Sequence, residues 1–207
     1  MRNAALTALV LFCSIPNYAQ DTKMNTLFDS HLKSSGGYGA LTNKFSRIRG
    51  EFANLSGIYG GWFINHRLMI GLGGEATTNN LRVPDQYSAK PGEAMTYQYS
   101  QFGLMTEYVV ASNKSVHVVL QALAGTGFSL QYQRNGWRDY PDFNYTADEN
   151  WFVVAEPGIQ LEMNLFKWMR FSPGVSYRAS FGSNGAGLGD KEISGFSYGA
   201  TLKFGRF

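Results

Sequence analysis

The sequence has little cysteine, little charge and no long hydrophobic run beyond its first residues. Its 207 residues include one cysteine, Cys13, so a chain that has lost a leader would have no disulfide and no thiol chemistry. Charged residues make up 16% of the chain, against about 25% in soluble domains. The formal net charge of +3 is too small and too dispersed to indicate binding of nucleic acid. Gly, Gln, Glu or Arg interrupts every later apolar run, which excludes a transmembrane helix.

The N-terminus has the layout of a cleaved secretory signal. Arg2 precedes an apolar stretch that ends at Ile15, and the small residue Ala19 follows. A positive start, an apolar centre and a small residue at the cleavage point are typical of export signals. We therefore expect a signal peptide, a short periplasmic N-terminal segment and one barrel domain, over residues 1–19, 20–35 and 36–207.

Apolar and polar residues alternate in segment after segment behind this leader. From Trp151 to Leu165 every odd position is apolar, which is the period of a β-strand with one oily and one more polar face. Tight turns alternate with long loops between such segments, as in outer-membrane barrels. The eight strands that this pattern predicts cover residues 36–43, 51–64, 67–78, 95–111, 115–131, 150–164, 168–181 and 194–204.

Matching the faces of neighbouring strands predicts the lengths of the turns. The second and third strands are expected to turn the following oily residues outward: Ala53, Leu55, Tyr59, Phe63, Leu68, Ile70, Leu72 and Ala76. The change from odd to even positions requires a two-residue turn, Asn65-His66. The fourth and fifth strands keep one parity, which predicts a three-residue turn over residues 112–114. The first connection, residues 44–50, is expected to be a loop of intermediate length.

The composition of the two faces indicates which one points outward. The polar face carries mainly Gly, Ser, Gln and Thr, with too few charges for the outside of a soluble lipocalin-type barrel. The opposite face has no Asp, Glu, Lys or Arg within the strand cores, as hydrocarbon requires. Only helices and closed barrels pair every backbone group inside a bilayer. We therefore expect an all-β protein, an eight-stranded antiparallel up-and-down transmembrane β-barrel integral to a bacterial outer membrane.

Charged side chains on the polar face should fill the barrel. An eight-stranded barrel leaves an interior just wide enough for side chains. The register predicts that Glu162 lies opposite Arg170, that Arg178 lies diagonal to Glu156, and that Glu107 lies diagonal to His117. We interpret the set as ion pairs of a closed core rather than as a catalytic or proton-relay cluster. Its members are Glu75, Glu107, Glu156, Glu162, Arg170, Arg178, Lys203 and His117.

No catalytic or metal-binding motif stands out. Ser115 and His117 lie two residues apart on one strand, and a lipid A deacylase needs such a nucleophile and base. Both lie at the periplasmic end, however, whereas that reaction takes place at the outer leaflet. Neither the histidines nor the acids have the spacing of a metal site. We therefore expect no catalytic residue, no metal and no cofactor.

One long loop has the composition of a contact surface. It mixes aromatic residues with Arg and Asp, and aromatic and Arg side chains dominate binding interfaces. The alternative is that these rings cap the barrel mouth or lie in the interfacial aromatic girdle. The candidate contact residues are Trp137, Arg138, Tyr140, Phe143 and Tyr145.

Several short segments carry a family resemblance. They are Gly36-Gly37-Tyr38-Gly39, Lys44-Phe45, Gly50-Glu51-Phe52 and Gly60-Gly61-Trp62-Phe63-Ile64-Asn65-His66. With them the chain resembles the small OmpX-like and OmpA-barrel-like outer-membrane proteins over nearly all its mature length. The resemblance implies the barrel fold and no reaction. Phe207 resembles the terminal phenylalanine that the barrel-assembly machinery reads, although its parity differs from that of Phe204 unless Gly205 forms a bulge.

These features together predict a non-enzymatic role. We expect a structural or interaction protein that presents its loops outside the cell or associates with larger outer-membrane assemblies. A narrow channel for small solutes and a lipid-modifying enzyme are the alternatives. The expected partners are outer-membrane lipid and lipopolysaccharide, the barrel-assembly machinery and other outer-membrane proteins, with no nucleic acid.

Overall fold

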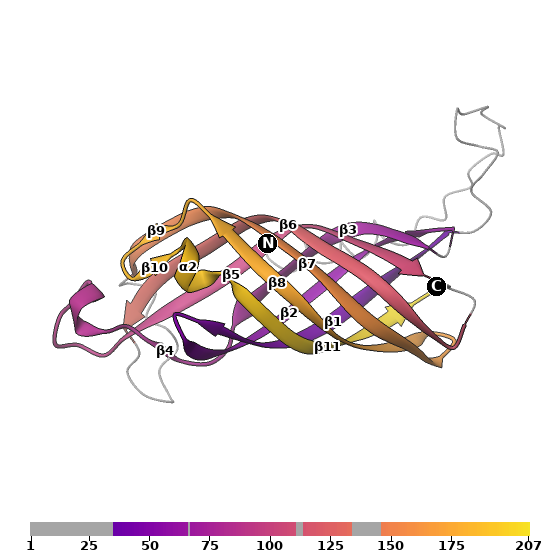
Figure 1. Cartoon of the computed structure of the whole chain (residues 1–207), viewed down its shortest axis with the longest axis horizontal. Coiled ribbons are helices and arrows are strands. Elements are labelled where there is room, and N and C mark those ends of the chain that lie inside the picture. Colours follow the sequence, from indigo (N-terminus) through magenta and orange to yellow (C-terminus); the bar gives the residue numbers. More distant parts are fainter. Residues whose placement is uncertain (1–34, 66, 111–113, 134–145) are drawn as a thin grey trace, which may run out of the picture. The chain divides into compact units, whose positions relative to one another are not determined.

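The computed structural model describes residues 35–65, 67–110, 114–133 and 146–207. One antiparallel sheet closes on itself (Figure 1), because each long strand pairs with its sequence neighbour and the first pairs with the last. This confirms the predicted eight-stranded up-and-down barrel. The strands of the ring are β1 (Ser35–Ile48), β2 (Glu51–Ile64), β3 (Leu68–Thr77), β5 (Met95–Val110), β6 (Val116–Gln133), β7 (Thr146–Phe166), β8 (Met169–Phe181) and β11 (Gly195–Gly205). The predicted leader and nearly all of the segment 20–35 lie outside the described residues.

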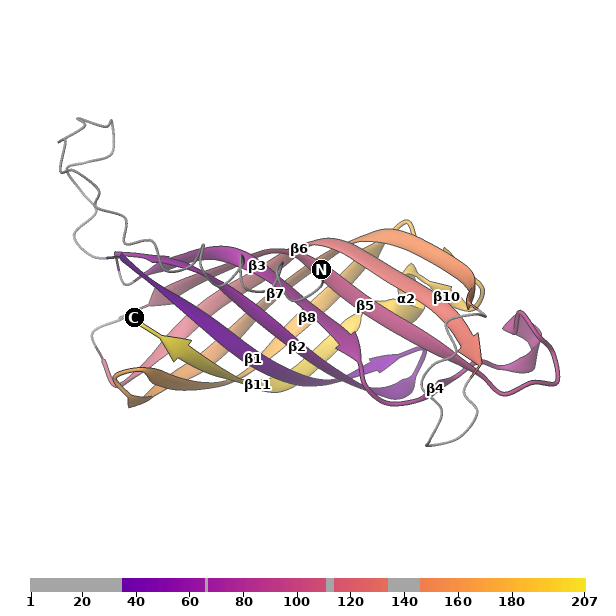
Figure 2. The same cartoon turned by 180° about the vertical axis from the view of Figure 1, so that it is seen from behind.

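Short elements gather at one end of the barrel, which we call the loop end. The opposite, terminal end receives the last residues of the chain, as both views show (Figures 1 and 2). No helix among the described residues is long and apolar enough to cross a membrane. The short elements are β4 (Leu81–Arg82), the 3₁₀ helix η1 (Asp85–Tyr87), β9 (Asn184–Gly185), β10 (Leu188–Gly189) and the single-turn helix α2 (Asp190–Ile193).

Large apolar side chains cover the outside of the strands. Ile58, Trp62 and Leu72 are 66%, 61% and 71% exposed, an exposure that water disfavours and hydrocarbon accepts. Other members of this surface come from every strand of the ring: Leu41, Phe45, Phe52, Ile70, Phe102, Leu104, Tyr108, Val110, Leu120, Trp151, Val153, Ile159, Leu161, Tyr177, Phe181, Phe196, Tyr198 and Leu202.

Aromatic rings cluster on this surface toward both ends of the barrel. Near the loop end, the rings of Phe128 and Trp151 lie 4.5 Å apart between centroids. At the terminal end, Phe166 stacks on Trp168 at 5.6 Å, and Trp168 stacks on Phe204 at 6.2 Å. Two such belts around an apolar band are typical of barrels that cross a bilayer.

The prediction for the faces of β2 was wrong. Leu55, Tyr59 and Phe63 are buried inside the barrel, whereas Phe52 and Trp62 point outward. Ile64 pairs with Leu68, so residues 65–67 form a three-residue connection and even positions face outward in both strands. Both faces of β2 are rich in apolar residues, and alternation alone therefore did not distinguish them.

The prediction of an intermediate loop over residues 44–50 was also wrong. β1 continues to Ile48, which pairs with Glu51. Arg49 and Gly50 connect the two strands with φ angles of 56° and 78°, and two positive φ values are those of a tight type I′ turn. Arg is not a residue that signals this turn, so the sequence concealed it. As a result Lys44 lies within a strand, at a position that faces inward.

The hairpin of β5 and β6 differs from the prediction by two positions. Val110 pairs with Val118, whereas the predicted turn over residues 112–114 would pair Val110 with Val116. Val116 has its partner on the other side of β6, where it pairs with Met163 of β7. A shift of two residues leaves every side chain on the same face. The alternation of apolar and polar residues therefore agrees with either register. Residues 111–113 lie outside the described part of the chain.

Candidate functional site: the charged interior

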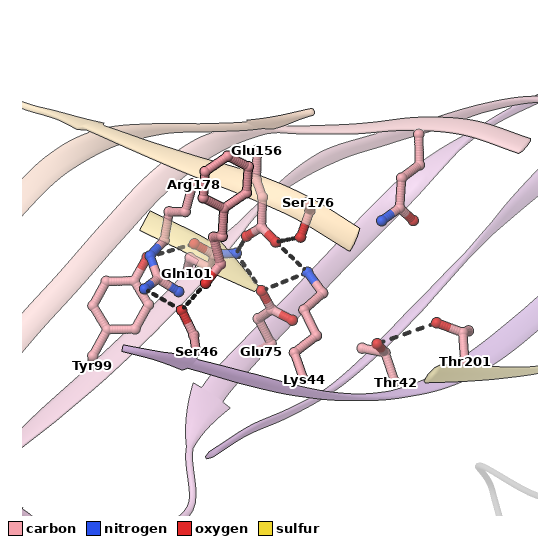
Figure 3. Close-up of polar contacts among 12 residues, drawn as sticks. Thr42, Lys44, Ser46, Glu75, Tyr99, Gln101, Glu156, Ser176, Arg178 and Thr201 are labelled. Carbon is pink, nitrogen blue, oxygen red and sulfur yellow. Dashed lines mark hydrogen bonds and ion pairs between the residues drawn. The ribbon is translucent and has the colours of Figure 1, made fainter. Parts of the chain in front are cut away.

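The first group of charges inside the barrel is centred on Lys44 of β1 (Figure 3). Its Nζ atom lies 2.9 Å from Glu75 Oε1 and 2.6 Å from Glu156 Oε1. Gln101 Nε2 donates to both carboxylates, and Ser176 Oγ donates to Glu156 at 2.5 Å. Five strands thus supply one hydrogen-bonded unit, which we call the Lys44 cluster. Its single cation neutralises one of the two carboxylate charges.

Arg178 supplies the other positive charge next to this cluster. Its Nε donates to the Ile193 carbonyl oxygen at 3.0 Å, and its Nη2 donates to Ser46 Oγ at 3.2 Å. The guanidinium carbon lies 4.9 Å from the centre of the Tyr99 ring. Arg178 therefore connects the Lys44 cluster to the loop end of the barrel. The predicted partner of Arg178 was Glu156, but Glu156 forms its ion pair with Lys44.

The second group of charges is centred on Glu162 of β7, nearer the terminal end. Glu162 Oε1 lies 2.7 Å from Arg170 Nη1 and 2.8 Å from His117 Nε2. Glu162 Oε2 lies 2.5 Å from Lys203 Nζ and accepts from Ser172 Oγ at 3.1 Å. We call this group, together with Glu107, the Glu162 cluster. Glu162 thus faces two permanent cations, Arg170 and Lys203, as well as His117, and Glu107 supplies the second negative charge of the group.

Glu107 is the second carboxylate of the Glu162 cluster. It lies 2.8 Å from Lys203 Nζ and accepts from the hydroxyls of Tyr38 and Tyr59. Lys203 therefore bridges Glu107 and Glu162. Since each carboxylate has several donors within reach, burial of these charges is compensated by hydrogen bonds as well as by pairing.

A layer of uncharged polar side chains separates the two clusters. Gln160 Nε2 donates to Gln121 Oε1 at 2.8 Å, and Thr201 donates to Thr42 at 3.3 Å (Figure 3). Two interior cavities border this layer, with volumes of about 20 Å³ and about 10 Å³. Such volumes correspond to about one water molecule each. The middle of the described barrel therefore holds side chains rather than an open bore.

An apolar plug closes the interior at the loop end. All of its members are buried, and together they fill the space between the Lys44 cluster and the barrel mouth. They are Ile48, Ala53, Leu55, Leu81, Val83, Met95, Tyr97, Tyr99, Phe152, Val154, Leu188 and Ile193. At this end, β4, β10 and α2 contribute side chains to the plug, so the loops are part of the closed core.

At the terminal end, the ring of Phe207 lies inside the barrel. Its centroid is 5.1 Å from that of Tyr38 and 6.3 Å from that of Phe63. The guanidinium carbon of Arg170 lies 3.9 Å from the centre of the Phe207 ring, which is close enough for a cation–π interaction. Phe207 thus covers the Glu162 cluster on the side of the terminal end.

The eight interior charges named from the sequence are all buried in the structure. The predicted contact of Glu162 with Arg170 is present, but Arg170 pairs with Asn164, because β7 continues to Phe166 and bulges between Asn164 and Phe166. His117 contacts Glu162 rather than Glu107. Lys44 was not predicted to face inward, although its even position matches that of the inward Tyr38, because the predicted strand ended at residue 43.

The geometry around His117 does not suit nucleophilic catalysis. Its Nδ1 faces the Lys114 carbonyl oxygen at 3.1 Å and its Nε2 faces Glu162 at 2.8 Å. Both ring nitrogens therefore have structural partners, whereas Ser115 is exposed. Among the described residues, no group of three or more His, Cys, Asp or Glu side chains has the geometry of a metal site.

The loop between β8 and β11 is held by one carboxylate at its base. Asp190 accepts from the backbone N–H groups of Ser183 at 2.8 Å and Gly182 at 3.0 Å, and from the Ser180 hydroxyl at 3.2 Å. The hydrogen bond from Ser183, with those from Gly182 and Ser180, holds the pKa of Asp190 below its usual range. The predicted contact residues Trp137 to Tyr145 belong to another loop, which lies outside the described residues.

Asp190→Asn should abolish a pH-dependent loosening of this loop. Because the folded pKa is lowered, the carboxylate stabilises the loop above the usual aspartate pKa of about 3.9, and this contribution is lost as the pH falls through the folded value. The amide resonances of Gly182 and Ser183, followed by NMR in detergent micelles, should titrate in the native protein and stay flat in the variant. Asp85→Asn, at an exposed position, should leave the titration unchanged; a titration that survives Asp190→Asn would contradict the assignment.

Comparison with known proteins identifies the architecture. No protein-family model matches the chain, and no curated protein matches it. The solved structure of Neisserial surface protein A is 11% identical, with a TM-score of 0.52 over 82% of this chain and 96% of that one. The fold is that of a small outer-membrane β-barrel. A major outer membrane protein from Thermus thermophilus supports this, with 10% identity and a TM-score of 0.50 over 82% of this chain and 98% of that one.

Proposed function

We propose that the protein is an integral, non-enzymatic component of a bacterial outer membrane whose barrel is closed to solutes. Its role is that of a structural or interaction protein, which acts through its loop end or through contacts with neighbouring membrane components. The apolar exterior with aromatic belts supports the location, since this surface suits hydrocarbon and not water. The barrel would have its termini in the periplasm and its loop end outside the cell.

The filled interior is the observation that carries this proposal. Four carboxylates face four permanent cations in the two clusters and at Arg178, and the apolar plug lies above them. A solute on its way through the barrel would have to displace buried ion pairs, and breaking one such pair costs about 3–5 kcal/mol. A structural role for the charges therefore explains them better than conduction does.

The remaining elements of the proposal concern partners. Lipid and lipopolysaccharide would surround the exterior, and the barrel-assembly machinery would insert the chain with Phe207 as its signal. The loop with Trp137, Arg138, Tyr140, Phe143 and Tyr145 would offer a contact surface to other proteins. The signal peptide over residues 1–19 would direct export.

Planar-bilayer recording tests whether the barrel is closed. We expect the refolded protein to insert without steady single-channel openings, because the two clusters and the plug fill the described interior, and the two cavities that border its polar layer measure about 20 Å³ and about 10 Å³. Insertion of the same refolded protein into lipid vesicles should be checked by protease protection and by a heat-dependent shift in gel mobility. Protein-free detergent and heat-unfolded protein serve as controls. Openings of constant size whose frequency rises with the amount of folded protein would favour the small-solute channel instead.

A further inference from the structure

A hollow of about 800 Å³ lies on the outer wall at the loop end. The pairing of β1 with β11 ends at Ser46 and Ser197, whereas β1 continues to Ile48. The two strands therefore part near the barrel rim, below α2. Beyond this point the Arg49 N–H donates to the Glu192 carbonyl oxygen of α2 at 2.6 Å, and residues of β1, α2 and β11 line the hollow.

The membrane side of this hollow is aromatic. Phe45, Phe52, Phe196 and Tyr198 line it, with exposed fractions of 48%, 58%, 60% and 60%. The rings of Phe45 and Phe52 stack at 5.9 Å, and Phe45 pairs across the sheet with Tyr198. Four aromatic side chains from β1, β2 and β11 thus lie together on the outer face of the barrel, where hydrocarbon chains would lie.

The loop side of the hollow is cationic. Arg47, Arg49 and Lys191 line it together with one acid, Glu192, so the lining charges sum to +2. Arg49 is held in place, since it donates to the Gly187 carbonyl oxygen at 2.9 Å and lies 4.5 Å from the centre of the Tyr87 ring. Arg47 and Lys191 are exposed, and neither forms an ion pair within the described part of the chain.

We propose that this hollow binds the phosphorylated headgroup of a glycolipid of the outer leaflet. Arg47 follows Phe45 by two positions, which places the cation about 6–7 Å further along the strand toward the barrel rim. An amphiphile that lies along the wall would therefore set its acyl chains on the aromatic rings and its phosphate between Arg47 and Lys191. Guanidinium and ammonium groups form strong charge-assisted hydrogen bonds with phosphate. This inference rests on the proposed outer-membrane location and orientation.

Binding of diphosphoryl lipid A to the folded, full-length mature barrel tests the proposal. Native mass spectrometry from a non-ionic detergent would measure the fraction of protein with lipid A bound across a titration. The double variant Arg47→Gln/Lys191→Gln should bind about ten-fold more weakly, because two charge-assisted contacts are lost. The matched control Lys114→Gln/Lys167→Gln removes the same charge from exposed residues at the terminal end, and it should bind like the native protein.

Binding of three ligands, namely diphosphoryl lipid A, dephosphorylated lipid A and inorganic phosphate, distinguishes the phosphate contact from other sources of affinity. Dephosphorylated lipid A should bind the native protein about ten-fold more weakly than diphosphoryl lipid A, and inorganic phosphate at millimolar concentration should not displace the lipid. Equal affinity of native protein and double variant, equal affinity for both lipids, or displacement by phosphate alone would each overturn the proposal. Failure of the native barrel to insert into vesicles would instead contradict the proposed function, so the two failures are distinguishable.

Discussion

Glu162→Gln should lower the unfolding temperature of the barrel by on the order of 10 °C. The substitution removes the carboxylate that lies 2.7 Å from Arg170 and 2.5 Å from Lys203. Lys203 retains Glu107, but Arg170 is left without its carboxylate in a buried site. An uncompensated buried charge costs about 3–5 kcal/mol, and about 1 kcal/mol corresponds to about 2–4 °C in a domain of this size. Circular dichroism of the protein in detergent measures the transition.

A control and a double variant separate burial from loss of charge. Glu93→Gln removes a carboxylate whose partner Lys90 lies 3.6 Å away at the surface, and it should change the unfolding temperature little, since exposed pairs contribute about 0–1 kcal/mol. In the Glu162→Gln background, Arg170→Gln should cost much less than it does alone. Additive losses would show that the two residues are not energetically coupled.

Lys44→Met should destabilise the barrel by a similar amount, about 3–5 kcal/mol. The ammonium group lies between Glu75 and Glu156, at 2.9 Å and 2.6 Å, so its removal leaves two buried carboxylates bridged by Gln101. Methionine keeps much of the volume of the side chain, so the effect reports the lost charge. Urea unfolding in lipid vesicles, followed by tryptophan fluorescence, gives the change in free energy.

Removal of one negative charge should recover part of this loss. Glu75→Gln in the Lys44→Met background removes one of the two facing carboxylates, and the double variant should be more stable than Lys44→Met alone. The matched control is Lys114→Met, because Lys114 is exposed and its substitution should change the free energy of unfolding by less than about 0.5 kcal/mol. If Lys44→Met behaves like Lys114→Met, the Lys44 cluster does not hold the barrel together.

The predictions that were wrong have a common physical origin. Alternation reports only whether a residue lies on the same face as its neighbour, so a register shift of two is invisible to it. This is why the pairing of Val110 with Val118 was missed, and why His117 was assigned to Glu107 instead of Glu162. In β2, where the inward Leu55 and Phe63 are as apolar as the outward Ile58 and Trp62, the pattern did not distinguish inside from outside.

Most of the residues that face the interior could be predicted from the sequence, but the contacts between them could not. The inward position of Glu75, Glu156 and Arg178 follows from the parity of strands whose limits were clear. Lys44 was lost because Arg49 adopts a positive φ of 56°, a conformation that the sequence around it does not signal. Because this turn was not recognised, the predicted interior did not include Lys44, the cation that pairs with both Glu75 and Glu156.

The sequence by itself determined the number of strands, the apolar exterior and the burial of the predicted charges, because side chains in a strand alternate faces with a period of two wherever the strand runs. Only the tertiary structure decided which carboxylate meets which cation, since those contacts cross the barrel between residues as distant as Lys44 and Glu156. It also decided that the rings of Phe207 and Tyr99 and the helix α2 close the two ends. These groups meet only when the sheet closes, and the local pattern of residues in one strand does not predict contacts across the closed barrel.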